Sequence, residues 1–273
     1  MSDISALVDP VWLHAHPETR IVDLRWAARG PLARQRYDQG HIPGAVFVDL
    51  DRDLSRPGGP GRHPFPAEKD FAALLSRLGI APGTQVVVYD QRDGSVAARL
   101  WFMLRAHGHT NVSLLDGGLE GWVAVGLPLS REEPRIEPAP LRKLTLDRSQ
   151  IVDAGEVARR GKAVLLDARA PERYRGETEP IDPRAGHIPG ALNAPFARNL
   201  DPRGRFLPPA ELRKLYEGHP PGVIVSCGSG VTACHDAFAI ALAGLPPARL
   251  YVGSWSGWIE DPSRPIALGP EPG

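Results

Sequence analysis

One cysteine of this chain lies where a strand, a tight loop and a helix are predicted to follow one another. Residues 223–226 form an apolar, β-branched run that is typical of a buried strand. The apolar residues of 232–242 have the spacing of a helix with one buried face. Cys227 stands between them, and Gly228 and Gly230 allow the loop to fold around its sulfur. Because amide N–H groups at a helix start favour an anion, the sequence predicts a nucleophilic thiolate here.

The loop sequence CGSGVTA at 227–233 resembles the active-site loop of the rhodanese superfamily, in the form typical of 3-mercaptopyruvate sulfurtransferases. A cysteine after a strand is otherwise often a small core residue, but here the resemblance extends over the whole loop. Rhodaneses that prefer thiosulfate generally carry basic residues where this chain has Gly228 and Ser229. The related phosphatases have a longer loop closed by an arginine, which binds phosphate bidentately. The resemblance therefore implies transfer of sulfur rather than of phosphate.

The resemblance also implies catalytic roles. Cys227 is expected to carry the transferred sulfur as a persulfide. Ser229 is expected to act with His63 and Asp51 in polarising the donor or relaying a proton. Histidine suits that task because its ordinary pKa is about 6.5.

A further set of residues is implied to bind the donor. Arg173 and Arg184 match the substrate-binding arginines of the family, and arginine's planar fork binds a carboxylate through two parallel hydrogen bonds. Arg175 has no such match. The other expected binding residues lie in the loop and are Gly228, Gly230, Val231 and Thr232.

The same short sequences occur twice along the chain, in the same order and at nearly constant spacing. The pairs are HIPGA at 41–45 and 187–191, the apolar runs 86–90 and 223–227, and Gly-Trp at 121–122 and 257–258. This order indicates a duplicated domain. In each copy short apolar strands alternate with helical patterns, which predicts an α/β fold. We therefore expect two tandem rhodanese-like domains, each a mainly parallel sheet flanked by helices.

The expected domain limits follow from composition. Residues 1–128 form the first domain, the proline-rich and charged segment 129–142 is a linker, and 143–273 form the second, catalytic domain. The tail 262–273 is rich in proline and glycine and is expected to pack loosely.

The first copy is predicted to be catalytically silent. Asp90 stands where the second copy has Cys227, and a carboxylate cannot accept a sulfur as a persulfide. Residues 91–93 are not expected to form the same glycine-lined amide cradle. Features that both copies share are predicted to be structural, and so is Cys234 on the apolar face of its helix; the shared residues are Asp23, Arg25, Asp167, Arg169, His41 and His187.

Composition narrows the function classes. The 273 residues are 42% hydrophobic, and Lys+Arg and Asp+Glu both number 32, a balance that does not suggest a nucleic-acid or membrane-surface protein. The two cysteines and the absence of a signal-peptide pattern at the N-terminus predict a cytoplasmic protein. No metal or organic cofactor is expected, because no cluster has ligand spacing.

The expected substrates are a small anionic sulfur donor, 3-mercaptopyruvate, and an acceptor that is a thiol or cyanide. Two alternatives stay open at this point. One is a thiosulfate sulfurtransferase, and the other is a non-catalytic sulfur carrier or regulatory module of the same fold.

Overall fold

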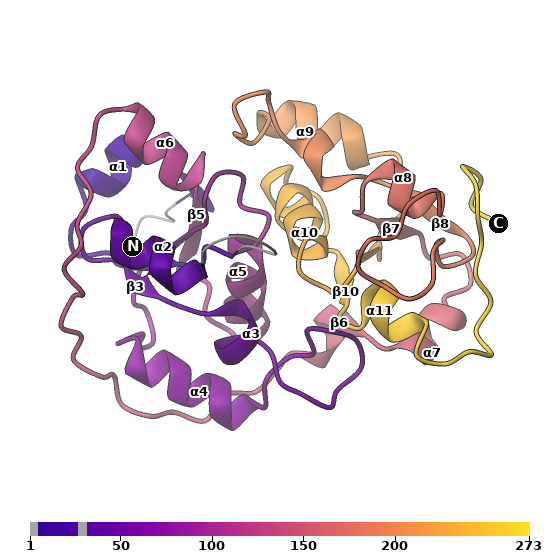
Figure 1. Cartoon of the computed structure of the whole chain (residues 1–273), viewed down its shortest axis with the longest axis horizontal. Coiled ribbons are helices and arrows are strands. Elements are labelled where there is room, and N and C mark those ends of the chain that lie inside the picture. The colour runs from indigo at the N-terminus through magenta and orange to yellow at the C-terminus, as the bar shows by residue number, and fades with distance from the viewer. Residues whose placement is uncertain (1–4, 27–31) are drawn as a thin grey trace. The chain divides into compact units, whose positions relative to one another are not determined.

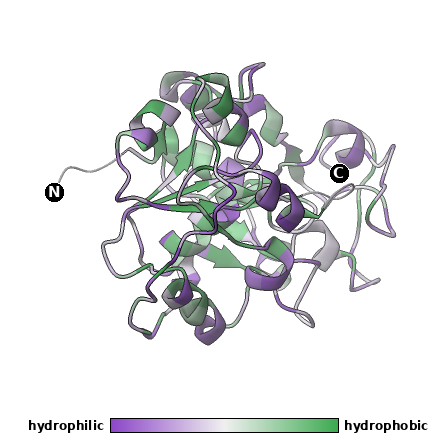
Figure 2. Cartoon of the chain, turned by 60° about the vertical axis from the view of Figure 1, so that its left-hand side comes forward, coloured by the Kyte–Doolittle hydropathy of each residue, from purple (hydrophilic) through white to green (hydrophobic). Residues whose placement is uncertain are grey.

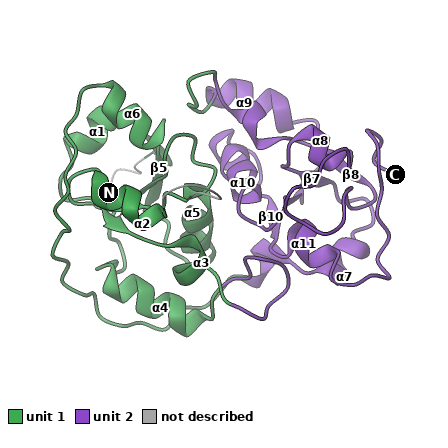
Figure 3. Ribbon diagram, viewed as in Figure 1, with its two compact units in different colours: residues 1–56, 66–147, 202–206 green, residues 57–65, 148–201, 207–273 purple. Residues whose placement is uncertain are grey.

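The structure is a computed structural model that describes residues 5–26 and 32–273. They form two compact units, shown in two colours in Figure 3. Unit 1 comprises residues 1–56, 66–147 and 202–206, and unit 2 comprises residues 57–65, 148–201 and 207–273. Two short segments thus group with the unit from the other half of the chain. The domain limits predicted from composition stay a prediction.

Unit 1 is built on a five-stranded sheet with the order β1-β5-β4-β2-β3, in which every pair is parallel. Its strands are β1 Leu7–Val8, β2 Arg20–Asp23, β3 Val46–Phe47, β4 Val86–Tyr89 and β5 Val112–Leu115. Its helices are α1 Pro10–His14, α2 Ala33–Gln39, α3 Leu50–Asp53, α4 Glu68–Arg77, α5 Ala97–Ala106 and α6 Gly118–Ala124 (Figure 1).

Unit 2 repeats this topology with the order β6-β10-β9-β7-β8, again with parallel pairs throughout. Its strands are β6 Ile151–Val152, β7 Leu165–Asp167, β8 Ala191–Asn193, β9 Ile224–Ser226 and β10 Arg249–Tyr251. Its α-helices are α7 Ala154–Ala158, α8 Pro171–Tyr174, α9 Pro209–Tyr216, α10 Ala233–Leu242 and α11 Ser254–Trp258, with 3-10 turns at Arg148–Gln150 and Phe196–Asn199. The predicted α/β fold of two sheet-and-helix domains is confirmed.

Burial explains why the strands are apolar along their whole length. All four residues of β4 and all three of β9 are buried, as expected for a parallel sheet covered by helices. Hydrophobic residues accordingly concentrate along the strands in Figure 2. The helix α4 buries only the face with Phe71, Leu74 and Leu75. Each central strand ends in a loop that leads to a helix, the usual place for a ligand site in such sheets.

The proline-rich segments that follow each sheet are docked rather than loose. Ser130 forms an antiparallel bridge with His41 in unit 1, and Ala267 forms the equivalent bridge with His187 in unit 2. The amide of Gly190 also donates to Pro272 O at 2.6 Å. The expectation of a loosely packed tail is therefore wrong, because backbone pairing fixes it despite its composition.

The shared polar residues hold each sheet together, as predicted. Asp23 binds Arg25 through an ion pair of 2.8 Å, and Asp167 binds Arg169 at 2.6 Å. All four side chains are buried. None of the helices in the described ranges is long and apolar enough to cross a membrane.

Candidate active site

The loop after β9 surrounds the sulfur of Cys227. The side chain is only 2% exposed, and the amide of Gly230 donates to its Sγ at 3.1 Å. Gly230 has a φ of +76°, and a Cβ there would lie 2.4 Å from Val252 O. Only glycine fits that position. The loop thus presents a backbone donor to a buried sulfur, as the sequence predicted.

The start of α11 holds this loop in place. The amides of Trp255 and Ser256 donate to the carbonyls of Cys227 and Gly228, both at 2.9 Å. The Ser254 hydroxyl accepts from the Cys227 amide at 3.0 Å and lies 3.9 Å from its Sγ. Ser254 is buried and has a φ of 49°, a left-handed conformation that costs a non-glycine residue about 1–3 kcal/mol. The strain is found beside the candidate nucleophile.

Residues 57–65 complete unit 2 from a distant part of the sequence. His63 lies on this segment, with its Nδ1 2.7 Å from the Ser229 hydroxyl. The structure thus brings two predicted catalytic residues together. Asp51 lies on α3 of unit 1, where it accepts a hydrogen bond from the Trp26 indole at 3.3 Å. Its predicted part in catalysis stays a prediction.

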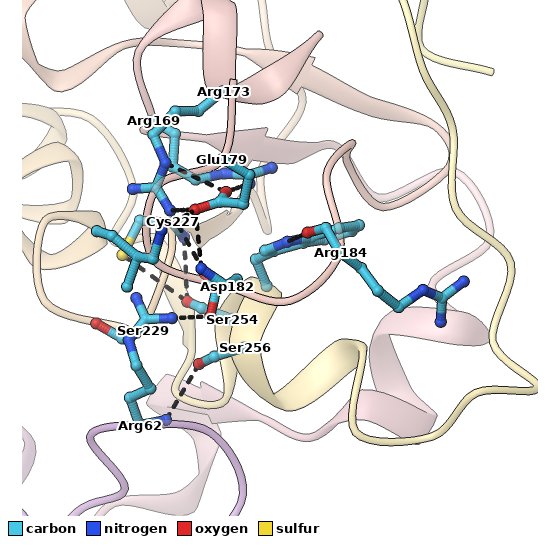
Figure 4. Close-up of polar contacts among 12 residues, drawn as sticks. Arg62, Arg169, Arg173, Glu179, Asp182, Arg184, Cys227, Ser229, Ser254 and Ser256 are labelled. Atoms are coloured by element: carbon cyan, nitrogen blue, oxygen red, sulfur yellow. Dashed lines mark hydrogen bonds and ion pairs between the residues drawn. The ribbon is translucent and has the colours of Figure 1, made fainter. Parts of the chain in front are cut away.

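Two arginines converge on the loop (Figure 4). A Cβ built on Gly228 would lie 3.0 Å from Nη2 of Arg62 and 3.5 Å from both terminal nitrogens of Arg173. Asp182 joins the two guanidinium groups, through an ion pair with Arg62 and a contact of 3.4 Å with Arg173. Glu179 binds Arg173 at 2.7 Å. The absence of a side chain at Gly228 leaves room for these cations.

Buried charge balances this cluster. Burial alone would raise the pKa of Glu179, but hydrogen bonds, first from Arg173, hold that pKa below its ordinary value. Burial alone would lower the pKa of Arg169, and negative charge, first from Asp167 and then from Glu179, raises it instead. Arg169 therefore stays a cation within the cluster.

The structure does not bring Arg184 to the loop. Its side chain extends away from Cys227 in Figure 4, and its carbonyl accepts from the Trp255 indole at 2.9 Å. The substrate role predicted for Arg184 is therefore not supported by its position, because the chain turns there to pack its backbone on α11. Arg175 is paired with Glu177 at 2.7 Å, on a solvent-facing part of the segment.

The other loop residues lead into α10. Val231 is buried and Thr232 is partly buried, directly before the helix begins at Ala233. Cys234 is fully buried and donates its thiol to Gly230 O at 3.3 Å, which fits the predicted structural role. Both cysteines are unbridged. In the described part of the chain, no three His, Cys, Asp or Glu side chains are grouped to hold a metal ion.

The loop of unit 1 that holds Asp90 also forms an amide cradle. One oxygen of Asp90 accepts from the amides of Arg92 and Gly94 at 3.1 and 3.0 Å, and the other accepts from Val96 and Ala97 at 2.9 and 3.1 Å. The sequence predicted that residues 91–93 do not form the same glycine-lined cradle as the Cys227 loop, and that stays a prediction, although Arg92 of this segment contributes one of the four amides. Backbone amides form the cradle around Asp90 whatever the side chains are, and Gly94, with a φ of +76°, provides the turn.

The surroundings of the two loops differ in charge. A pocket of about 260 Å³ in unit 1 is lined by Trp26, Asp90, Gln91, Arg92, Asp93, Ser95, Val96 and Glu120. Its three carboxylates outnumber its single arginine, and Arg92 is engaged by Glu120 at 3.8 Å. Burial raises the pKa of Asp90, and the charge of Asp93 adds to the rise. Among the described residues that line this pocket Arg92 is the single arginine, whereas two arginines lie beside Gly228.

Two residues of the site escaped the sequence interpretation. Arg62 precedes His63 directly, so the only signal was its place beside a candidate residue. Ser254 was detectable through the repeat, because the shared Gly-Trp pair places it opposite Gly118 of the first copy. Both have left-handed φ values, 54° at Gly118 and 49° at Ser254.

The chain was compared with known protein families, curated proteins and solved structures. A model of the rhodanese-like domain matches residues 9–125 and 152–261, one match in each half of the chain. The chain belongs to the rhodanese family. A protein of Pseudomonas aeruginosa named "Probable 3-mercaptopyruvate sulfurtransferase" is 48% identical, over 93% of this chain and 94% of its own length.

The names of similar proteins refer to two different sulfur donors. A thiosulfate sulfurtransferase of Rattus norvegicus is 38% identical, over 93% of this chain and 92% of its own. A crystal structure from Escherichia coli, described as a 3-mercaptopyruvate sulfotransferase with the rhodanese fold, superposes with a TM-score of 0.81. It is 34% identical and covers 93% of this chain and 100% of its own. These matches confirm the predicted family and fold, and both named relatives belong to the predicted class of enzyme, the sulfurtransferases.

Proposed function

We propose that this protein is a 3-mercaptopyruvate sulfurtransferase that carries sulfur as a persulfide on Cys227. The observation that carries the proposal is the position of Cys227. Its buried sulfur accepts a hydrogen bond from the amide of Gly230 in the loop. Nitrogens of Arg62 and Arg173 lie beside the next residue, Gly228. A nucleophile, a backbone donor and anion-binding cations thus occur together in unit 2.

In the first half-reaction the Cys227 thiolate attacks the donor sulfur. A sulfur–sulfur bond forms, the carbon–sulfur bond breaks, and its electron pair leaves on the carbon side as the enolate of pyruvate. The enolate takes up a proton to give pyruvate. The Ser229 hydroxyl, 2.7 Å from His63, is suited to deliver that proton. Asp51 is proposed to support His63.

In the second half-reaction an acceptor takes the outer sulfur. A thiolate or cyanide attacks it, the sulfur–sulfur bond breaks, and its electrons return to Cys227 as a thiolate. The products are a hydropersulfide or thiocyanate. The two halves share one enzyme intermediate, so the kinetics are expected to be ping-pong. We place this chemistry in the cytoplasm, on the cysteine usage noted above, and include no nucleic acid or membrane among its partners.

The preference for mercaptopyruvate rests on the neutral residues Gly228 and Ser229. Thiosulfate carries its charge directly on the atom next to the transferred sulfur, which favours basic residues on the loop itself. The carboxylate of mercaptopyruvate lies further from the sulfur and suits arginines from neighbouring segments, among which Arg173 is best placed. A thiosulfate preference is the second candidate, because a relative of similar identity carries that name.

The nucleophile is tested by substitution and by mass. Cys227→Ser is expected to lower transfer by at least about 10⁴-fold, since a hydroxyl cannot form the persulfide. Cys234→Ser, the matched control, should keep most of the activity. After donor treatment, intact-mass spectrometry should show one added sulfur on the peptide with Cys227. Sulfur found on Cys234 would overturn the assignment.

The donor and the carrier alternative are tested together. The kcat/KM of the wild type should be higher for mercaptopyruvate than for thiosulfate, with cyanide as acceptor. A non-catalytic carrier would take up one sulfur per chain and stop, so continued thiocyanate production distinguishes an enzyme from a carrier.

A further inference from the structure

Arg62 lies on the segment 57–65, which belongs to unit 2 and is held there by backbone hydrogen bonds. The amide of Gly61 donates to Glu260 Oε1 at 2.8 Å, and the amide of Arg62 donates to Ser256 Oγ at 3.1 Å. Gly61 has a φ of +79°, and a Cβ there would lie 2.6 Å from Gly253 O. The backbone of this segment therefore packs directly against the start of α11, the helix that also holds the Cys227 loop.

The guanidinium of Arg62 is oriented by this anchoring. Its Nη1 binds Asp182, whose side chain is 4% exposed, and its Nη2 is directed toward Gly228. Gly228 follows the nucleophile directly, and consecutive Cα atoms are about 3.8 Å apart. The cation is thus held within about one residue of Cys227.

Arg173 reaches the same place from α8. Both of its terminal nitrogens lie 3.5 Å from the Cβ position of Gly228, and Asp182 contacts its Nη2 at 3.4 Å. One buried carboxylate therefore holds two guanidinium groups on one side of the loop. Bringing two like charges together costs energy unless an anion lies between them. Asp182 lies between the two guanidinium groups and Glu179 binds Arg173, while nitrogens of both arginines are also directed toward Gly228, where a donor anion would contact both.

We propose that Arg62 and Arg173 form one anion site beside the nucleophile, and that Asp182 positions both arginines. The ligand is the carboxylate of the sulfur donor or, with thiosulfate, its sulfonate. The inference deepens the proposed function and rests on it. Arg62 thereby adds a second cation, from a neighbouring segment, to the one that Arg173 supplies beside Gly228.

The test is a double-mutant cycle on kcat/KM for mercaptopyruvate with cyanide as acceptor. Arg62→Gln and Arg173→Gln should each lower kcat/KM about 10- to 100-fold, as expected for a lost hydrogen bond to a charged group. The double variant should lose less than the product of the two, because both arginines bind the same anion. Arg175→Gln, which removes an arginine paired only on the surface side, is the matched control and should stay within about twofold.

A second measurement separates anion binding from docking of the segment. In the Cys227→Ser background, calorimetric titration with pyruvate should show weaker binding after Arg62→Gln, with a smaller dependence on ionic strength. Arg62→Lys should restore part of the affinity, because it keeps the charge. A merely structural role of Arg62 would leave pyruvate binding unchanged.

The outcomes distinguish the two proposals. A wild type that turns over neither donor contradicts the proposed function. If the wild type turns over mercaptopyruvate but Arg62→Gln behaves like Arg175→Gln, the anion site is overturned and the proposed function stands. Strict multiplication of the two single effects would show that the arginines do not share an anion, and would also overturn the inference.

Discussion

The loops after β4 and β9 have similar backbone hydrogen bonding but hold different side chains. Each follows a buried central strand and is held by two amides of a short helix, Leu119 and Glu120 in unit 1 and Trp255 and Ser256 in unit 2. Each directs amides of the loop at the side chain that follows the strand, four amides in unit 1 and that of Gly230 in unit 2. In unit 1 that side chain is the carboxylate of Asp90, and in unit 2 it is the sulfur of Cys227.

The comparison indicates that the amide cradle does not depend on which side chain it holds, whereas the proposed sulfur transfer does. The cradle comes with the fold, because it is made of main-chain groups. The chemistry depends on the side chain at one position and on the charges around it. Unit 1 surrounds Asp90 with further carboxylates, whereas unit 2 places Arg62 and Arg173 beside its loop.

The largest expected effect comes from moving the thiol between the two loops. The variant Cys227→Ser with Asp90→Cys should show no turnover of either anionic donor, although its new thiol faces an amide cradle. The reason is that Asp93 repels the donor, while the arginine of the pocket, Arg92, is already engaged by Glu120. The thiol should still react with neutral iodoacetamide, which checks that it is folded and accessible. Turnover in this variant would show that the cradle alone suffices.

A smaller effect is expected on the stability of unit 1. Asp90→Ala leaves buried loop amides without their acceptor, which should lower the free energy of unfolding by about 1–3 kcal/mol. Urea denaturation measures it. The kcat/KM of the folded protein should be unchanged, since Asp90 lies in the loop that we predict to be catalytically silent. An unchanged midpoint would mean that water replaces the carboxylate without loss.

The helices after the two loops differ in buried charge, and this predicts a pH effect. The helix α5 buries Arg99, whereas α10 buries Asp236, which accepts from Asn199 at 2.8 Å. Burial raises the pKa of Asp236 to about 8, despite hydrogen bonds that favour its ionised form. Between its ordinary pKa and about 8 the folded protein holds a proton that the unfolded chain has lost.

The free energy of unfolding should therefore fall as the pH rises through this window, by up to about 1.4 kcal/mol per pH unit. Below the ordinary pKa of an aspartate the contribution is fully present. Asp236→Asn should flatten this dependence, as measured by denaturation between pH 5 and pH 8. Parallel curves for the wild type and the variant would contradict the assignment.

The smallest effect concerns Ser254 and its counterpart Gly118, both in left-handed conformations. Ser254→Gly should relieve the backbone strain but lower kcat about fivefold, since it removes a hydrogen bond to Cys227 worth about 1 kcal/mol. Gly118→Ala should destabilise the protein without changing kcat, because a Cβ there would lie 2.7 Å from Asp90 O. Equal kcat for Ser254→Gly and the wild type would make the serine purely structural.

The sequence predicted best those features that depend on a repeated motif or on the type of one residue. The repeated HIPGA and Gly-Trp pairs predicted the duplication, and apolar spacing over 232–242 predicted the helix that the structure has as α10, Ala233–Leu242. Cys227, Ser229 and His63 were predicted, and the last two lie in contact.

Other features depend on three-dimensional placement that no local pattern contains. Arg62 lies beside the Cys227 loop, which is more than 160 residues further along the chain. This proximity depends on the packing of residues 57–65 in unit 2, which no local pattern contains. The cradle around Asp90 is made of amides, which every residue except proline possesses, so side-chain composition could not reveal it. The direction of the Arg184 side chain could not be predicted either, because a match in a loop of different length does not fix where a side chain points.

The assignment of residues 57–65 to unit 2 bears on how this duplicated gene can evolve. A fragment limited to residues 143–273 would keep Cys227 but lack Arg62 and His63. The residues around Cys227 therefore come from both halves of the sequence, although Cys227 itself stands in the second half. On the proposed function, deletion of residues 1–128 would remove part of the site, so the two halves would have to be inherited together.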